Sequence, residues 1–502
     1  MVIRDGPGRE DAASGDTLFG GSRSWIWLAG LGALLCAGAI IAPLPALALV
    51  LAGLGLLLLL RWWPVSGMVL LMLTAHLTHF KAEIGPVSVR PEHLAVMAVG
   101  GVLLWKALAR KRPIVLDPPA FFALAWFGVN VLATMINAPD PSDSLRHIFR
   151  LGLMAATYCV VINLLETPAG WWTAFGWLLG LAVAQDAFGL AARALYNFGV
   201  NIGVQVTMVL PVPVPYGTLE EGNMFGSQSA AWLVLFVALF FVGPGRQVRR
   251  RLAGKYTVCT LLAACAITGT AVLLSLSRGA WVALLIGLAL LFIVYPVSPR
   301  VRRKRALLLI VSLPIFLLVM AAAVELLPAT VPLAARIKSF TTAVTDATFK
   351  NRLADIADAV ADWQRHPFIG WGPGTFFQLH GMRWYAVAWI ANQTARTLQE
   401  TGILGLLAFW GFLASVFWVA LRGVRRLQGS TPGSPERIGR AALLGLACGL
   451  LILQIAFQAT DGTWLSYMWV HAALLTAGAR LLPRGLCRAG LPRQVDRKVH
   501  CV

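Results

Sequence analysis

Long uninterrupted runs of apolar residues alternate along the chain with short polar segments that are mostly basic. A bilayer core about 30 Å thick is crossed by roughly 20 helical residues, so runs of this length predict membrane-spanning helices. We predict fourteen spans, at 25–42, 44–60, 65–80, 91–108, 119–136, 148–165, 171–192, 226–243, 256–275, 279–297, 306–325, 402–421, 441–460 and 464–482. The runs are continuous rather than alternating, which disfavours a transmembrane β-barrel.

These spans divide the chain into five segments and predict an all-α polytopic membrane protein. A polar cytoplasmic tail is predicted for residues 1–24, spans one to eleven for 25–325, and the last three spans for 402–482. Residues 326–401 form one large extracytoplasmic loop, and residues 483–502 form a basic cytoplasmic tail. The large loop is therefore the main place outside the bilayer where a site can be built.

Composition and charge agree with this interpretation. Of the 502 residues 58% are hydrophobic and only 13% are charged, which excludes a soluble enzyme of this size. If the N-terminus is cytoplasmic, 29 of the 42 Lys and Arg fall on the inner side, as the positive-inside rule requires. The net charge of +20 therefore reports topology and not nucleic-acid binding. None of the seven cysteines falls in an outer loop, which argues against a disulfide framework there.

Within the large loop, residues 351–363 have the spacing of an amphipathic helix. Its two faces hold Leu353, Ile356, Val360 and Trp363 on one side and Asp355, Asp358 and Asp362 on the other. The three carboxylates are either ligands for a hard cation or a solvated face, and we favour the solvated face. Gly370, Gly372 and Gly374 follow Pro367 and permit a tight turn.

Basic residues on the outer side are mostly arginine, ten of thirteen. Arginine carries a planar fork of donors that matches phosphate oxygens. Arg278 stands in a hairpin between two apolar spans, where it either snorkels to the interface or holds an anion. The arginines of the large loop that can converge on the same place are Arg352, Arg365, Arg383 and Arg396.

Other polar residues leave two interpretations open. His366 and His380 flank the glycine turn and are candidates for proton transfer, or else they are structural. Asp186 lies within a predicted span, where an ionisable group is either functional or paired, here with Arg193 two turns further on.

Three motifs follow one another in an order and membrane placement that resembles a known family. Residues 275–279 read Ser-Leu-Ser-Arg-Gly between two spans, 351–376 carry R…W…P-x-x-G-x-G, and 400–405 read Glu-Thr-Gly-Ile-Leu-Gly at the start of a span. A weaker match, Glu-Gly-Asn-Met-Phe-Gly, lies at 221–226. Together they resemble the O-antigen ligases and O-antigen polymerases of bacterial envelopes over roughly residues 215–420.

One position departs from the pattern of that family. In its ligases a His-Asn pair precedes the third motif, and the matching residues here are Ala391 and Asn392. The absent histidine favours a polymerase, or a ligase that recruits its base elsewhere, over a lipopolysaccharide-core ligase.

The resemblance implies a GT-C-like glycosyltransferase of the bacterial inner membrane with both termini in the cytoplasm. Its site is expected to face the periplasm and to need no metal or other cofactor. Its partners are then the bilayer, a polyprenyl-diphosphate-linked oligosaccharide donor and a glycan or lipid-linked acceptor, with no nucleic acid. We assign the diphosphate and glycan to Arg278, Arg352, Arg383, Arg396, Asn392 and Trp363, and catalysis to His380, Glu221 or Glu400, among which the sequence does not decide.

A transporter or flippase of lipid-linked saccharides is the alternative, because it would also be polytopic and basic inside. Transporters place broken helices and ionisable groups near the membrane midplane, in two repeated halves. Here the polar residues gather at one face beside a single long loop, and no repeat is visible. The sequence therefore favours catalysis over transport.

Overall fold

The computed structural model describes residues 64–84, 87–109, 113–206, 212–242, 256–295, 336–337, 347–381, 390–427 and 435–488. By contacts the chain divides into Met1–Trp62 and Trp63–Val502, and every described residue belongs to the second unit. The predicted tail 1–24, the predicted spans 25–42, 44–60 and 306–325, and Arg383 lie outside the described residues.

Helices make up most of the described chain. In order they are α3 (Val65–Ala75), α4 (Pro91–Ala109), α5 (Pro118–Asn137), α6 (Pro141–Leu164), α7 (Pro168–Tyr196), α8 (Gly222–Val242), α10 (Tyr256–Leu274), α11 (Arg278–Val294), α14 (Ala347–Trp363), α15 (Thr375–His380), α16 (Gln393–Arg426), α17 (Pro435–Ala456), the short 3₁₀ helix η2 (Phe457–Ala459) and α18 (Ser466–Arg488). One of these helices lies at each of the eight predicted spans from 65–80 to 279–297 and at each of the last three, from 402–421 onward. Seven are long and apolar enough to cross a membrane, so the protein is a multi-pass helical membrane protein.

Three of the helices begin by the same device, a capping side chain followed by proline. Asp117, Asp140 and Thr167 precede α5, α6 and α7, and each accepts a hydrogen bond from a backbone N–H of the first turn. Proline suits the first helical position because its missing N–H has no partner there in any case. A cap of this kind stabilises a helix by about 1 kcal/mol and fixes where it begins.

Two short antiparallel hairpins, which the sequence did not predict, accompany the helices of the described chain. Strand β1 (Ala82–Ile84) pairs with β2 (Val87–Val89) between α3 and α4, and β3 (Val204–Val206) pairs with β4 (Pro213–Pro215) between α7 and α8. The prolines of β4 are tolerated because a two-stranded ribbon consists only of edge strands. Both hairpins connect helices on the same side of the bundle.

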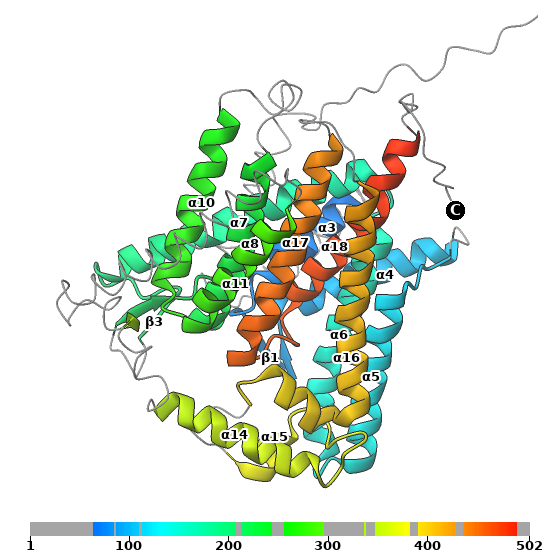
Figure 1. The fold of residues 1–502 in the computed structure, drawn as a ribbon. Helices are drawn as coiled ribbons and strands as arrows, with labels where there is room; N and C mark the ends of the chain where they lie inside the picture. The colour runs from blue at the N-terminus through cyan, green and yellow to red at the C-terminus, as the bar shows by residue number, and fades with distance from the viewer. Residues whose placement is uncertain are drawn as a thin grey trace, which may run out of the picture. The chain divides into compact units, whose positions relative to one another are not determined.

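In Figure 1, α8, α10, α11, α16 and α17 run up and down the bundle, whereas α4 and α7 are strongly tilted, and the chain reverses between one helix and the next. The starts of α4, α6, α8, α11, α16 and α18 therefore meet the ends of α3, α5, α7, α10 and α17 at one end of the bundle, which we call the loop end. α14 and α15 lie at this end, in the lower part of Figure 1, and α14 packs against α16. At the opposite end Arg480 pairs with Asp117, and α16 finishes with Arg425 and Arg426.

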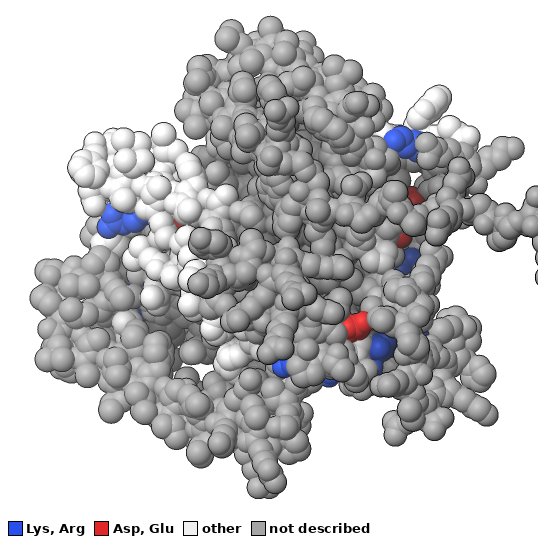
Figure 2. Space-filling model, turned by 90° about the horizontal axis from the view of Figure 1, so that it is seen from above, with Lys and Arg blue, Asp and Glu red and all other residues white. Residues whose placement is uncertain are grey.

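Close packing of the helices depends on small and aromatic residues. A Cβ on Gly423 would lie 2.7 Å from Ala479 of α18, and one on Gly445 would lie 2.6 Å from Leu235 of α8. Close approach at small residues is how helices associate in membranes, where dispersion replaces the hydrophobic effect. Trp469 stacks on Phe412 with ring centres 4.8 Å apart. Seen from above, the described surface is mostly uncharged, with Lys and Arg at separate places (Figure 2).

The amphipathic helix of the large loop is confirmed as α14, but its predicted faces are wrong. Asp355 and Asp362 are buried, with exposed fractions of 9% and 3%, whereas Leu353 is 50% exposed. The buried face also holds Ala359, which packs with Phe376 of α15, Ala395 of α16 and Ile390 just before α16. His380 of α15 donates a hydrogen bond from Nε2 to Asp362 Oδ2, which offsets the cost of burying this carboxylate, so the acidic face turns inward.

Helix α16 bends at Gly402, where the predicted span begins. Gly402 has φ 61° and ψ −166°, so the helix is interrupted there and residues 393–401 precede the bend. The backbone N–H groups of Ile403 and Leu404, just after the bend, bond instead to the carbonyls of Pro367 and Phe368. The bend thus attaches the glycine turn of the large loop to the start of a long membrane helix.

Candidate functional site

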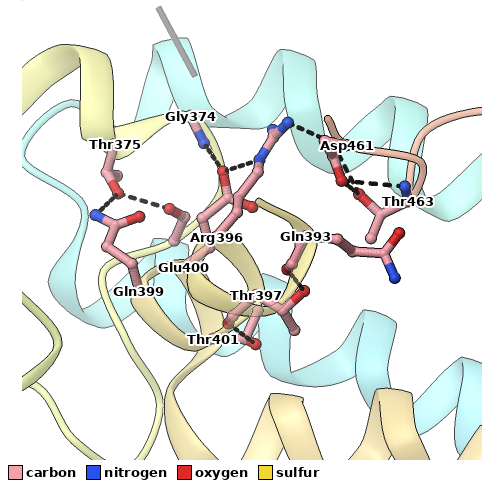
Figure 3. Close-up of polar contacts among 11 residues, drawn as sticks. Gly374, Thr375, Gln393, Arg396, Thr397, Gln399, Glu400, Thr401, Asp461 and Thr463 are labelled. Carbon is pink, nitrogen blue, oxygen red and sulfur yellow. Dashed lines mark hydrogen bonds and ion pairs between the residues drawn. The ribbon is translucent and has the colours of Figure 1, made fainter. Parts of the chain in front are cut away.

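A buried charge cluster lies at the loop end, where α16 meets the segment after η2. Arg396 donates from Nε to Glu400 at 2.9 Å and from Nη1 to Asp461 at 2.6 Å (Figure 3). All three side chains are buried. Two carboxylates therefore share one guanidinium, which joins α16 to the loop before α18.

The glycine turn is fixed on Glu400. The backbone N–H of Gly374 donates to Glu400 Oε1 at 2.9 Å, and that of Gly372 donates to the Glu400 carbonyl at 2.7 Å. Trp371 N–H bonds to the Gln399 carbonyl in the same way. Glu400 Oε1 thus accepts from Gly374 and Arg396 together, which is the arrangement of a carboxylate that organises a turn.

Alanine at Gly370 is expected to destabilise the folded protein by about 3 kcal/mol or more. Gly370 has φ +68°, and an added Cβ would lie 2.5 Å from the backbone of Glu400 and Thr401. Positive φ costs a residue with a Cβ about 1–2 kcal/mol, and overpacking adds about 1–3 kcal/mol. Gly199→Ala is the matched control, since its φ is +84° and no described atom lies within 4 Å of the added Cβ. Thermal unfolding in detergent checks this, and equal shifts for the two variants would contradict it.

Residues 275–279 and 222–226 pack against each other beside η2. A Cβ on Gly226 would lie 2.3 Å from Ser275 Oγ, and one on Gly279 would lie 3.2 Å from Ala459 of η2. Ser277 caps α11, which begins at Arg278. Leu276 has φ 51°, and its carbonyl accepts a hydrogen bond from Arg336 Nε at 2.7 Å. The first motif, which contains Arg278, and the weaker match at 221–226 therefore meet at the loop end.

Glu221 connects this pair of segments to the charge cluster. Thr460 Oγ1 donates to Glu221 Oε1 at 2.8 Å, and Thr460 directly precedes Asp461. Burial raises the pKa of Glu221 above its ordinary value, while the nearby Arg352 guanidinium of α14 acts in the opposite direction. A carboxyl group with a raised pKa is suited to accept a proton near neutral pH.

The sequence did not single out a second group of residues that lies beside the cluster. Arg90 pairs with Glu220, and the guanidinium groups of Arg90 and Arg150 lie 5.0 and 3.9 Å from the centre of the Trp464 ring. His147, one turn before Arg150 on α6, touches the glycine turn at Gly374. Both arginines belong to the thirteen mostly arginine basic residues predicted for the outer side, and the polar start of α6 was the sequence feature that could have pointed to Arg150 and His147. Neither the two arginines nor His147 lies in one of the motifs.

The remaining predicted site residues hold the large loop together. His380 Nε2 lies 2.7 Å from Asp362 Oδ2, and Trp363 Nε1 donates to the Pro367 carbonyl. Asn392 caps α16 through its side-chain oxygen and donates to the Gln458 carbonyl at 3.0 Å. His366 packs edge-on against the Trp371 ring. These contacts connect α14, α15, α16 and η2.

Asp186 does not pair with Arg193, so that alternative is wrong. Ser229 of α8 donates to Asp186 at 2.6 Å, whereas Arg193 donates to Asn197 of its own helix. Among the described residues, no group of three or more His, Cys, Asp or Glu is placed to hold a metal ion.

Comparison with known proteins identifies part of the chain. A family model described as O-Antigen ligase matches residues 263–410, and no curated protein matches the chain. The match contains the motifs at 275–279, 351–376 and 400–405, and it leaves out the weaker one at 221–226. The resemblance inferred from the motifs is therefore confirmed.

Proposed function

We propose that this chain, which carries an O-antigen ligase domain, is a membrane glycosyltransferase that polymerises or ligates preassembled glycans. Its donor is a polyprenyl-diphosphate-linked oligosaccharide, taken at the outer face of the inner membrane. The observation that carries the proposal is that motifs far apart in the sequence meet around Arg396, Glu221 and the 457–464 segment. Ala391 in place of a histidine favours polymerisation over transfer to a lipopolysaccharide core.

The orientation of the helices supports an outer site. The loop end holds the motifs and the large loop, whereas Arg425, Arg426 and Arg480 lie at the other end. Basic residues mark the cytoplasmic side of membrane proteins. The loop end is therefore the outer end in this proposal.

Stabilisation of the leaving group is the first chemical task. When the glycosidic bond breaks, the polyprenyl diphosphate leaves with negative charge, which guanidinium groups stabilise without a metal. Arg278 at the start of α11 and Arg352 on α14 are the proposed groups. Arg396 is held by two carboxylates, so its proposed role is to set the positions of Glu400 and Asp461.

Activation of the acceptor is the second task. The acceptor hydroxyl oxygen forms a bond to the anomeric carbon as the bond from that carbon to the phosphate oxygen breaks, and the hydroxyl proton passes to a base. Of the three predicted candidates, Glu400 accepts from both Gly374 and Arg396, and His380 is paired with Asp362 of the large loop, whereas Glu221 accepts from the neutral hydroxyl of Thr460. We therefore assign the base to Glu221, whose raised pKa fits the task.

Purified protein in lipid nanodiscs is expected to lengthen or transfer a defined undecaprenyl-diphosphate oligosaccharide by whole units, as resolved by mass spectrometry. Arg278→Lys and Arg352→Lys keep the charge but lose the two-donor fork, so each should lower turnover at least about tenfold. Arg365→Lys is the matched control, because Arg365 is an exposed residue just after α14. Near-normal turnover in both variants would refute the diphosphate assignment. Movement of labelled donor across the membrane without any product would favour a flippase instead.

A further inference from the structure

Arg150 of α6 is a half-buried cation that the proposed mechanism does not use. Its guanidinium lies 3.9 Å from the centre of the Trp464 ring. Its Nε and Nη2 atoms are buried, and no described residue accepts a hydrogen bond from either. Buried polar groups are nearly always hydrogen-bonded, so these two atoms call for a partner.

The charges around Arg150 increase the free-energy cost of leaving these two donors without a hydrogen-bond acceptor. Arg90 of the segment before α4 lies over the same Trp464 ring, and Arg396 of α16 also acts on the charge of Arg150. Glu92 and Glu220 oppose them electrostatically, yet Glu220 is bonded to Arg90. Burying a charged group without a partner is strongly unfavourable, and neighbouring like charges add to that cost.

The two unpartnered atoms have the geometry of an oxyanion receptor. Nε and Nη2 form one edge of the guanidinium, from which two parallel N–H bonds reach two oxygens of one phosphate or carboxylate. Stacking on Trp464 fixes the plane of the guanidinium and so the direction of both donors. A neighbouring arginine, Arg146, differs in both respects, because it pairs with Asp143 and its side chain is 44% exposed.

We propose that Arg150, positioned by Trp464, is a phosphate-binding residue that holds the diphosphate of the lipid-linked donor. This inference rests on the proposed function and adds a site on α6 that no motif contains. Arg150 lies near the boundary between the polar start of α6 and its apolar remainder, which is the depth at which a lipid phosphate lies. Two guanidinium groups on one ring suit a dianion better than a single sugar carboxylate.

Binding of undecaprenyl diphosphate without sugar tests the proposal independently of transfer. Wild-type protein and variants in nanodiscs are titrated with the lipid, and binding is followed by native mass spectrometry. Arg150→Gln is expected to raise the Kd at least about tenfold, since it removes both charge-assisted hydrogen bonds. Arg150→Lys, which keeps the charge without the fork, should raise it by a smaller factor. Arg146→Gln, one turn away on the same helix, should bind like wild type.

The outcomes separate this inference from the proposed function. Unchanged affinity in Arg150→Gln or Arg150→Lys would overturn the inference even if glycan transfer proceeds. Arg150-dependent binding would support it even if no transfer is seen, because the lipid carries no sugar. If a uronic-acid disaccharide binds in an Arg150-dependent way and the lipid diphosphate does not, the site takes a carboxylate and the proposal is wrong. If Arg150→Gln does not fold, as judged by thermal unfolding, the lysine variant decides.

Discussion

Replacing Arg396 by methionine is expected to lower the free energy of unfolding by about 3–5 kcal/mol, because it removes one partner of a buried ion pair network. Glu400 and Asp461, with exposed fractions of 6% and 1%, would lose the cation that they share. The glycine turn would loosen with Glu400, since Gly374 bonds to the same carboxyl oxygen. Thermal unfolding of the purified variant in detergent measures the loss.

The control for this prediction is Arg365→Met, which changes the same residue type at an exposed position. It should leave the melting temperature within a degree or so, because isolated surface charges contribute little. A second check is Glu400→Gln combined with Arg396→Met, which should recover part of the stability by removing one unpaired charge. Equal melting temperatures for Arg396→Met and Arg365→Met would show that the cluster does not stabilise the fold.

Replacing Glu221 by glutamine is expected to lower turnover by about 10²–10⁴, the usual contribution of a general base. The amide keeps the size of the side chain and can still accept from Thr460, so folding should be little changed. Turnover with a defined lipid-linked donor and the melting temperature are measured on the same preparation. Loss of turnover without loss of stability is the expected result, and full turnover would remove Glu221 from the mechanism.

The pH dependence of turnover follows from the same carboxyl group. A base acts only when deprotonated, and burial raises the pKa of Glu221 above its ordinary value. Turnover of the wild type should therefore fall on acidification at a higher pH than an ordinary glutamate would give. The residual activity of Glu221→Gln should lack this acidic limb, so an unchanged limb would point to another base.

How far the sequence alone reaches is clear from α14. Apolar periodicity located this helix, just as the apolar runs located the helices at 65–80 to 279–297 and at 402–421 to 464–482, of which seven are long and apolar enough to cross a membrane. The periodicity assigned the wrong face of α14 to the interior. Hydrophobicity alone does not reveal that His380 of α15 is placed to bond to Asp362 of α14. In a membrane protein an exposed leucine such as Leu353 is common, so the rule that apolar side chains face the protein interior does not predict which face is buried.

The sequence predicted those residues of the candidate site that belong to a family motif or to the arginine-rich loop. Arg278, Arg352, Arg396 and the glutamates were chosen because they stand in family motifs or in the arginine-rich loop. Arg90 and Arg150 lie 374 and 314 residues before Trp464 in the chain, and nothing local in the sequence reveals that both approach the same ring. Such contacts depend on how α4 and α6 pack against the start of α18, and periodicity within one helix does not encode this.

Photo-crosslinking of a donor tests most directly whether the meeting point of the motifs is the substrate site. An undecaprenyl-diphosphate oligosaccharide with a photoreactive group on its first sugar is irradiated with the protein in nanodiscs, and labelled peptides are mapped by mass spectrometry. We predict labels within residues 221–226, 275–279, 392–400 or 457–464. Labels confined to the end that holds Asp117 and Arg480 would contradict the account.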